Sequence, residues 1–94
     1  MPSPRSLQPV SLIMRKDELR QYISQQKRLV KAWPEVMGEM IAGYTQAVYI
    51  RNQTLHVKLS NPALRADLSM MRAEIVKKLN TAVGSQVIVE IRFS

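Results

Sequence analysis

The first third of the chain has a helical pattern of apolar residues. The residues that recur at this spacing are Leu12, Leu19, Tyr22, Ile23, Leu29, Val30 and Trp33. Because the spacing places apolar side chains on one side of a helix, it predicts a helix over residues 12–25 that either continues or restarts near residue 27. Ser11 comes just before this segment and belongs to the residue types that cap helix N-termini.

Pro34 predicts a break in the helical pattern. Its ring lacks a backbone N–H and clashes with the carbonyl of Val30, so we expect one helix to end before Pro34 and a second to begin with it. This second helix should run to Ala42 and end at Gly43, since glycine favours helix C-termini. Its apolar side would consist of Val36, Met37, Met40 and Ile41.

Two segments that follow alternate between apolar and polar residues, as strands do. Residues 45–51 place Gln46, Val48 and Ile50 on one face and Ala47, Tyr49 and Arg51 on the other. Residues 54–59 direct Leu55, Val57 and Leu59 toward a core and Thr54, His56 and Lys58 away from it. Asn52 and Gln53 between them predict a tight β-hairpin, because asparagine tolerates the positive φ that such a turn requires.

The last third of the chain predicts a long helix and a final strand. Asn61 and Pro62 form a helix start, and the residues that follow at helical spacing are Leu64, Leu68, Met71, Ile75 and Leu79. We expect one uninterrupted helix that ends between residues 80 and 83, before Gly84. Residues 87–93 then alternate, with Val87, Val89, Ile91 and Phe93 on one side and Ile88, Glu90 and Arg92 on the other.

The predicted order is helix, helix, strand, strand, helix, strand, which indicates an α+β domain. The final strand–helix–strand unit implies a right-handed crossover, and the helices would cover one face of a three-stranded sheet. The other sheet face would be exposed and would carry Tyr49, Arg51, His56 and Lys58. Residues 1–10 contain three of the five prolines and predict a flexible tail, so residues 11–94 would form the domain.

Charge is distributed unevenly along the 94 residues, whose formal net charge is +7. Residues 1–32 carry seven basic and two acidic side chains. Residues 33–60 have no net charge, and residues 61–94 carry five basic and three acidic side chains. The basic first third favours the phosphates of a nucleic acid or an acidic protein surface, and equally fits a solvated helix face. The basic residues of such an interface would be Arg15, Lys16, Arg20, Lys27, Arg28 and Lys31.

The predicted open sheet face is a second candidate site for nucleic acid. Tyr49 beside Arg51 and Lys58 combines a ring on which a base can stack with cations that pair with phosphates. Such a site would tolerate different sequences, because it presents no array of donors and acceptors for base edges. The alternative is an ordinary solvated sheet face, on which His56 is an exposed strand residue rather than a catalytic base.

Trp33 and the methionines each have a structural and a functional interpretation. Trp33 is either a core aromatic that anchors the helices on the sheet or a partner-binding residue, and the core role is the one that we favour. The methionines either fill the core, as we expect, or form a docking groove. These methionines are Met37, Met40, Met70 and Met71.

The sequence lacks the residues that catalytic, metal-binding and membrane-spanning functions need. One histidine and no cysteine do not supply the usual zinc ligands, and the three glycines are too widely spaced for a phosphate-binding loop. No apolar run reaches the roughly 18 residues of a membrane-spanning helix. We therefore expect a cytoplasmic protein that is not an enzyme, uses no cofactor or small-molecule substrate, and does not enter the membrane.

Short motifs follow one another at fixed spacing through the second part of the chain. They include Ala32-Trp33-Pro34-Glu35-Val36-Met37-Gly38, Tyr49-Ile50-Arg51-Asn52-Gln53-Thr54-Leu55, Leu64-Arg65 and Leu79-Asn80. This string resembles the DciA-like family over residues 29–94 and, more weakly, over residues 11–28. The resemblance implies a KH-like fold whose final strand is parallel to the second. It also implies a role in bacterial DNA replication, in which members bind DNA through basic surfaces and assist loading of the DnaB-type replicative helicase.

Nucleic-acid-binding KH domains hold the backbone with a Gly-x-x-Gly loop between two helices. Residues 61–80 contain no glycine, so we do not expect this clamp and disfavour an RNA-binding KH module. The chain is predicted to be a nucleic-acid-binding accessory protein of DNA replication, with single- or double-stranded DNA and the DnaB-type helicase as partners. The alternative is an interaction adaptor that docks an acidic protein without contacting DNA.

Overall fold

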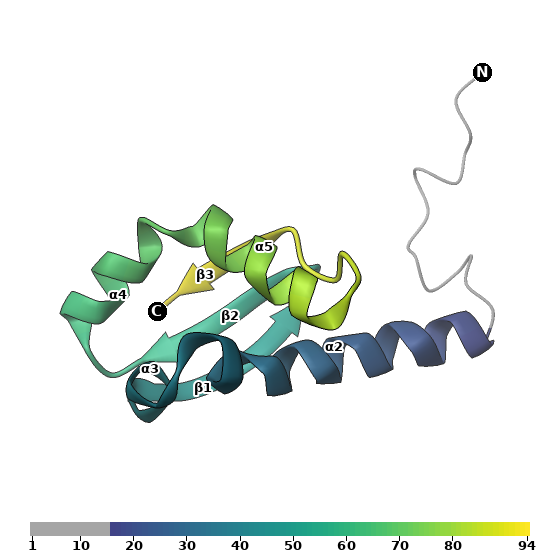
Figure 1. The fold of residues 1–94 in the computed structure, drawn as a ribbon, viewed down its shortest axis with the longest axis horizontal. Coiled ribbons are helices and arrows are strands. Elements are labelled where there is room, and N and C mark those ends of the chain that lie inside the picture. The colour runs from purple at the N-terminus through teal and green to yellow at the C-terminus, as the bar shows by residue number, and fades with distance from the viewer. Residues whose placement is uncertain (1–15) are drawn as a thin grey trace, which may run out of the picture.

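The structure is a computed structural model that describes residues 16–94. The elements in chain order are α2 (Lys16–Met37), α3 (Glu39–Tyr44), β1 (Thr45–Arg51), β2 (Thr54–Leu59), α4 (Pro62–Ser69), α5 (Arg72–Val83) and β3 (Glu90–Phe93) (Figure 1). The α+β class is confirmed, and the order of elements broadly matches the predicted one. The predicted tail, the Ser11 cap and the start of the first helix lie outside the described residues.

The three strands form one mixed sheet in the order β1-β2-β3. β1 and β2 are antiparallel, and β2 and β3 are parallel, so α4 and α5 belong to the crossover that joins β2 to β3 (Figure 1). Asn52 and Gln53 have φ values of 51° and 59°, which is the left-handed geometry of a two-residue hairpin. The predicted hairpin and the predicted parallel pairing of the last strand are therefore confirmed.

α2 runs through Pro34 as one helix of 22 residues, so the predicted break at Pro34 is wrong. Pro34 lies in the last turn, where its missing N–H removes one helical bond while its carbonyl accepts from the N–H of Gly38 at 2.9 Å. The helix ends where Gly38 takes a φ of 91°, which glycine adopts without strain. Gly43 does not end the next helix either, because α3 continues to Tyr44 and stops at the extended residue Thr45.

The helix predicted over residues 62–83 is divided into α4 and α5 at Met70 and Met71. Its start is confirmed, because the Asn61 side chain accepts hydrogen bonds from the N–H groups of Ala63 and Leu64 at 3.0 and 3.1 Å. The division lets the two helices take different directions, so that α4 packs on β2 and β3 while α5 packs on α2 and β3. The expectation of an uninterrupted helix was therefore wrong.

The prediction that all four methionines fill the core is also wrong. Met70 at the turn is 86% exposed, and Met40 and Met71 are exposed as well. Only Met37 packs against the core, as a partly buried residue. Helical spacing placed Met71 on the buried side, and the turn between α4 and α5 interrupts that spacing.

The segment before β3 departs from the predicted alternation. Val87 and Ile88 are both buried although they are neighbours, whereas Val89 is 57% exposed, and the strand begins only at Glu90. The Asn80 side chain of α5 explains the departure. Its Oδ1 accepts from the N–H groups of Val87 and Ile88, at 2.9 and 3.1 Å, and its Nδ2 donates to the Ile88 carbonyl at 2.8 Å. These bonds hold residues 87 and 88 on α5 rather than in the sheet.

Trp33 belongs to the core that lies between the helices and the sheet. Its side chain is 1% exposed, and its Nε1 donates to the Thr45 hydroxyl at 3.0 Å, which in turn donates to the Ile41 carbonyl at 2.8 Å. Its ring lies 6.1 Å from that of Phe93, centroid to centroid. Because a partner cannot reach a buried ring, the structure corrects the assignment of Trp33 as a partner-binding residue and supports its core role.

Candidate nucleic-acid interface

Tyr49, His56 and Arg92 form a row across the three strands. The strand register pairs Tyr49 with His56 and His56 with Arg92. Their neighbours Leu55 and Ile91 are buried in the core, and side chains alternate along a strand, so the row lies on the open face of the sheet. It places an aromatic pair beside a guanidinium group.

The rings of Tyr49 and His56 stack on one another. Their centroids are 4.9 Å apart and their planes differ by 10°. Tyr49 is the more accessible member, with 51% of its side chain exposed, whereas His56 is half-buried. The stack restricts the rotation of the tyrosine ring, so a ligand that packs on it would lose less conformational entropy than on a free side chain.

A hollow of about 320 Å³ adjoins this row near the hairpin. Its lining residues are Arg51, Asn52, Thr54, His56 and Arg92. Guanidinium groups form charge-assisted hydrogen bonds with phosphate oxygens, so two arginines at one hollow favour an anion. One carboxylate shares the face, because Glu90 is in register with Thr54. Lys58 is exposed one row further along β2, opposite Ala47.

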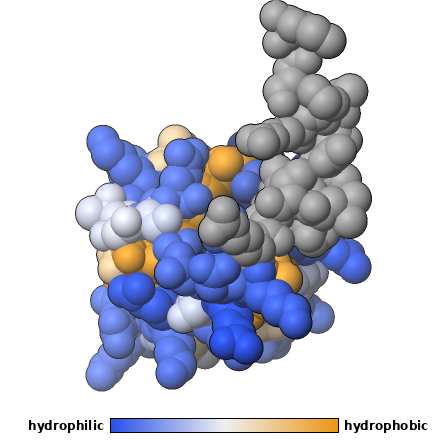
Figure 2. All heavy atoms as spheres, turned by 90° about the vertical axis from the view of Figure 1, so that its right-hand side faces the viewer, coloured by the Kyte–Doolittle hydropathy of each residue, from blue (hydrophilic) through white to orange (hydrophobic). Residues whose placement is uncertain are grey.

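Four basic residues of α2 form a stripe on the side of the helix that faces away from the core. They are Lys16, Arg20, Lys27 and Lys31, and all four are exposed. At 3.6 residues per turn they lie within an arc of about 60°. The opposite side of the helix carries the buried Leu29 and Trp33. Figure 2, which views the molecule from the α2 N-terminal end, shows a largely hydrophilic surface with small hydrophobic areas.

A groove of about 430 Å³ joins this stripe to the sheet. Its lining residues are Ile23, Gln26, Lys27, Val30 and Lys31 of α2 and Val48, Tyr49 and Ile50 of β1. Tyr49 thus borders both the groove and the open sheet face. The structure thereby brings Lys27 and Lys31 together with Tyr49, two groups that are separated in the sequence.

The remaining predicted site residues are not all in one place. Arg28 lines a second hollow, between α2 and α5, together with Glu35, and does not line the groove. Lys31 borders both the hollow and the groove. Lys16 and Arg20 continue the stripe along the part of α2 that projects beyond the sheet (Figure 1). Arg15 lies outside the described residues.

Arg92 is a candidate site residue that the sequence reasoning did not select. Alternation in the last strand correctly placed Arg92 opposite Ile91 and Phe93, but it did not say which residues of β2 would lie beside it. The parallel register supplies that information by pairing Arg92 with His56. The pairing of β2 with β3 was the signal that could have identified it.

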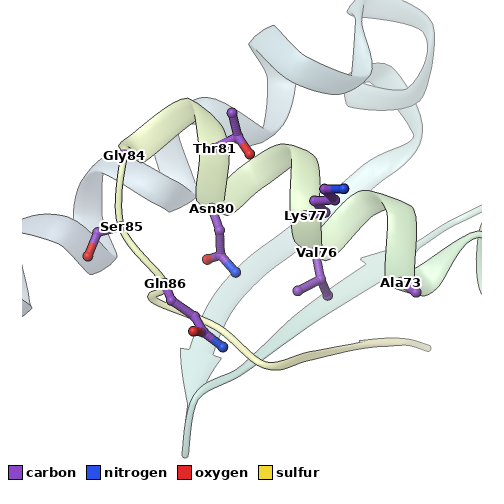
Figure 3. A pocket seen from close by; sticks show the side chains of 8 residues that line it. All are labelled: Ala73, Val76, Lys77, Asn80, Thr81, Gly84, Ser85 and Gln86. Carbon is purple, nitrogen blue, oxygen red and sulfur yellow. The ribbon is translucent and has the colours of Figure 1, made fainter.

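A further hollow, of about 560 Å³, lies between α5 and the segment that leads into β3. Figure 3 shows Asn80 pointing from α5 toward that segment, where its polar atoms bond to the backbone of Val87 and Ile88. Lys77 is the one charged residue of this lining.

Residues 16–94 offer neither a candidate metal site nor a candidate membrane-spanning helix. No group of three or more histidine, aspartate or glutamate side chains within this range is arranged to hold a metal ion. No helix within it is long and apolar enough to cross a membrane.

The chain matches a known protein family over nearly its whole length. Residues 8–93 match the family described as "Dna[CI] antecedent, DciA". A UPF0232 protein of Rhodococcus jostii (strain RHA1) is 32% identical over 62 residues, which is 66% of this chain and 33% of that protein. The chain therefore matches about a third of the length of this relative. Because the family match spans all the described elements, the chain belongs to the DciA family.

Proposed function

We propose that this chain binds single-stranded nucleic acid through the open face of its sheet and the adjoining side of α2. The observation that carries the proposal is the Tyr49–His56 stack in one row with Arg92. Single-strand-binding proteins combine exposed rings, on which bases of any kind stack, with cations that follow the phosphates. The row provides both groups on an exposed surface.

The distribution of charge supports the same ligand. Arg51 and Arg92 line the hollow near the hairpin together with His56 of the stack, and Lys27 and Lys31 line the groove that Tyr49 borders. A strand that stacks a base on Tyr49 would therefore have cations within reach in both directions. Such contacts carry no sequence information, so binding would tolerate different sequences.

Family membership supports a place for this activity in DNA replication. The DciA family is linked to loading of the DnaB-type replicative helicase. We propose that this chain acts as a non-enzymatic accessory domain in that process, in the bacterial cytoplasm, with the helicase as its protein partner. Binding of a single strand suits this role, because a loader that holds the strand can present it to the helicase.

A fluorescence-anisotropy titration of the full chain with labelled single-stranded and double-stranded DNA tests the proposal. Each single-strand phosphate contact contributes about −0.7 to the salt slope, so about four contacts would lower affinity roughly 50-fold for a fourfold rise in salt. We expect the single strand to bind more tightly than the duplex. Failure to bind either DNA at low salt would overturn the proposal.

Capture of the helicase is a separate experiment. Immobilised full chain is incubated with purified DnaB-type helicase, with and without nuclease treatment. Retention of the helicase after nuclease treatment supports direct contact. Loss of retention with nuclease would show that DNA bridges the two proteins, and the partner proposal would then fail while the DNA proposal stands.

A further inference from the structure

β1 is an edge strand with a groove along its free side. It pairs with β2 on one side, and no other strand of residues 16–94 pairs with its second side. The groove between α2 and β1 is lined by three consecutive β1 residues, Val48, Tyr49 and Ile50. Because the side chains of consecutive strand residues point to opposite faces, a groove lined by all three follows the edge of the strand.

The free backbone groups of β1 face this groove. In a two-residue hairpin the flanking residues, here Arg51 and Thr54, are a hydrogen-bonded pair, and bonded pairs then alternate along an antiparallel ladder. Tyr49 and His56 are the next bonded pair. The N–H and C=O groups of Val48 and Ile50 are therefore directed to the free edge, where they can pair with an added strand.

The remaining walls of the groove combine apolar and basic side chains. Ile23 is 42% exposed, and Val30 is partly buried, so both offer apolar surface on the α2 side. Lys27 and Lys31 are exposed at the same groove, and its lining contains no carboxylate. A ligand that fits these walls has alternating apolar and acidic side chains and an extended backbone.

We propose that an extended acidic segment of another protein binds in this groove and adds a strand to β1. Its backbone pairs with Val48 and Ile50, its apolar side chains pack on Ile23 and Val30, and its carboxylates lie against Lys27 and Lys31. Strand addition of this kind draws affinity from main-chain hydrogen bonds and specificity from alternate side chains. The inference does not depend on the proposed binding of nucleic acid, although both ligands would share the two lysines.

Charge complementarity favours this occupant over three others. A second copy of the chain paired edge to edge would bring two sets of Lys27 and Lys31 together, and like charges repel. Residues 1–15 of the same chain contain Arg5 and Arg15 and no acidic residue, so they do not complement the lysines. A nucleic acid lacks the repeating amide donors and acceptors that an open strand edge requires.

The test is amide hydrogen exchange of the ¹⁵N-labelled full chain with a capped peptide of about eight residues that alternates aspartate and valine. The control peptide has the same composition with all aspartates before all valines. We expect the alternating peptide alone to slow exchange of the Val48 and Ile50 amides. Equal protection by both peptides would overturn strand addition, as would the absence of protection at a saturating concentration.

Two variants separate this inference from the proposed DNA site. Ile23→Ser removes apolar surface from the groove without changing charge, and we expect it to weaken peptide binding at least about tenfold. Its effect on DNA affinity should be much smaller, because the proposed DNA contacts are made by the stacked rings and the basic side chains. Arg92 lies on the open sheet face, so Arg92→Ala should weaken DNA binding while peptide affinity is kept. If Ile23→Ser and wild type bound the peptide with equal affinity, binding of the peptide in the groove would be contradicted. Peptide-induced protection without any DNA binding would leave the groove in place and overturn only the proposed function.

Discussion

The ring of Tyr49 stacks on the ring of His56 across β1 and β2, with centroids 4.9 Å apart and planes 10° from parallel. The tyrosine is half exposed, so this stack presents an oriented aromatic surface to solvent. Arg92 extends the row onto β3. An isolated exposed tyrosine on a sheet is common, whereas an oriented ring between two groups of cations is suited to a strand of bases and phosphates.

Replacement of Tyr49 by alanine should weaken binding of single-stranded DNA. Loss of one stacked base is worth about 1–3 kcal/mol, which corresponds to roughly 5- to 150-fold in affinity. Tyr49→Phe keeps the ring and should bind almost as tightly as wild type. Anisotropy titrations of the three proteins with one oligonucleotide measure the difference, and unchanged affinity of Tyr49→Ala would contradict stacking on this ring.

The double variant Lys27→Ala/Lys31→Ala should lower the salt dependence of DNA binding. Two lost phosphate contacts reduce the slope of log affinity against log salt by about 1.4 for a single strand. Lys77→Ala/Lys78→Ala is the matched control, because these exposed residues lie on α5. Equal changes in both double variants would indicate a diffuse electrostatic attraction without a site at the groove.

Thr45→Val should destabilise the fold although the side chains have similar shapes. The Trp33 Nε1–H would lose its acceptor inside the core, and a buried donor without a partner costs about 1–3 kcal/mol. Urea unfolding followed by the fluorescence of Trp33, the single tryptophan, measures the free energy of unfolding. A variant as stable as wild type would show that this hydrogen bond is not needed by the core.

Asn80→Ala should release the segment before β3. The change removes the acceptor of the Val87 and Ile88 N–H groups and the donor to the Ile88 carbonyl. We therefore expect the free energy of unfolding, measured with urea, to fall by about 1–3 kcal/mol or more. Faster amide exchange at Val87 and Ile88 would accompany it. Thr81→Ala, an exposed neighbour on α5, is the control and should leave both quantities nearly unchanged. Similar effects of the two variants would argue against the role of Asn80.

Local patterns were sufficient to predict the hairpin, the cap at Asn61 and the buried face of β2. Each of these depends on residues close in sequence: φ at Asn52, the Asn61 side chain and the alternation of Leu55 and Val57. The position of helix ends was predicted less well. Pro34 in a last turn removes only one bond, and the turn at Met70 and Met71 depends on how α4 and α5 pack against different neighbours.

The candidate site, too, could be predicted only as far as it depends on residues close in sequence. Alternation placed Tyr49, Arg51, His56 and Lys58 on one face. It could not reveal that the rings of Tyr49 and His56 stack or that Arg92 lies in the same row. Helical spacing placed Lys27 and Lys31 on α2, yet their closeness to Tyr49 follows from the packing of α2 against β1. Likewise, Arg28 was grouped with these lysines by sequence position, whereas in the structure it shares a hollow beside α5 with Lys31 and does not line the groove.

The most direct test of the account is a ¹⁵N NMR titration of the full chain with a thymidine oligonucleotide of about ten nucleotides, which is within the usual span of a single-strand site. We predict that the largest amide shifts occur at Tyr49, His56 and Arg92, with smaller shifts at Lys27 and Lys31. The largest shifts on α5 around Lys77 and Lys78, with the Tyr49 row unchanged, would contradict the assignment of the open sheet face as the nucleic-acid interface.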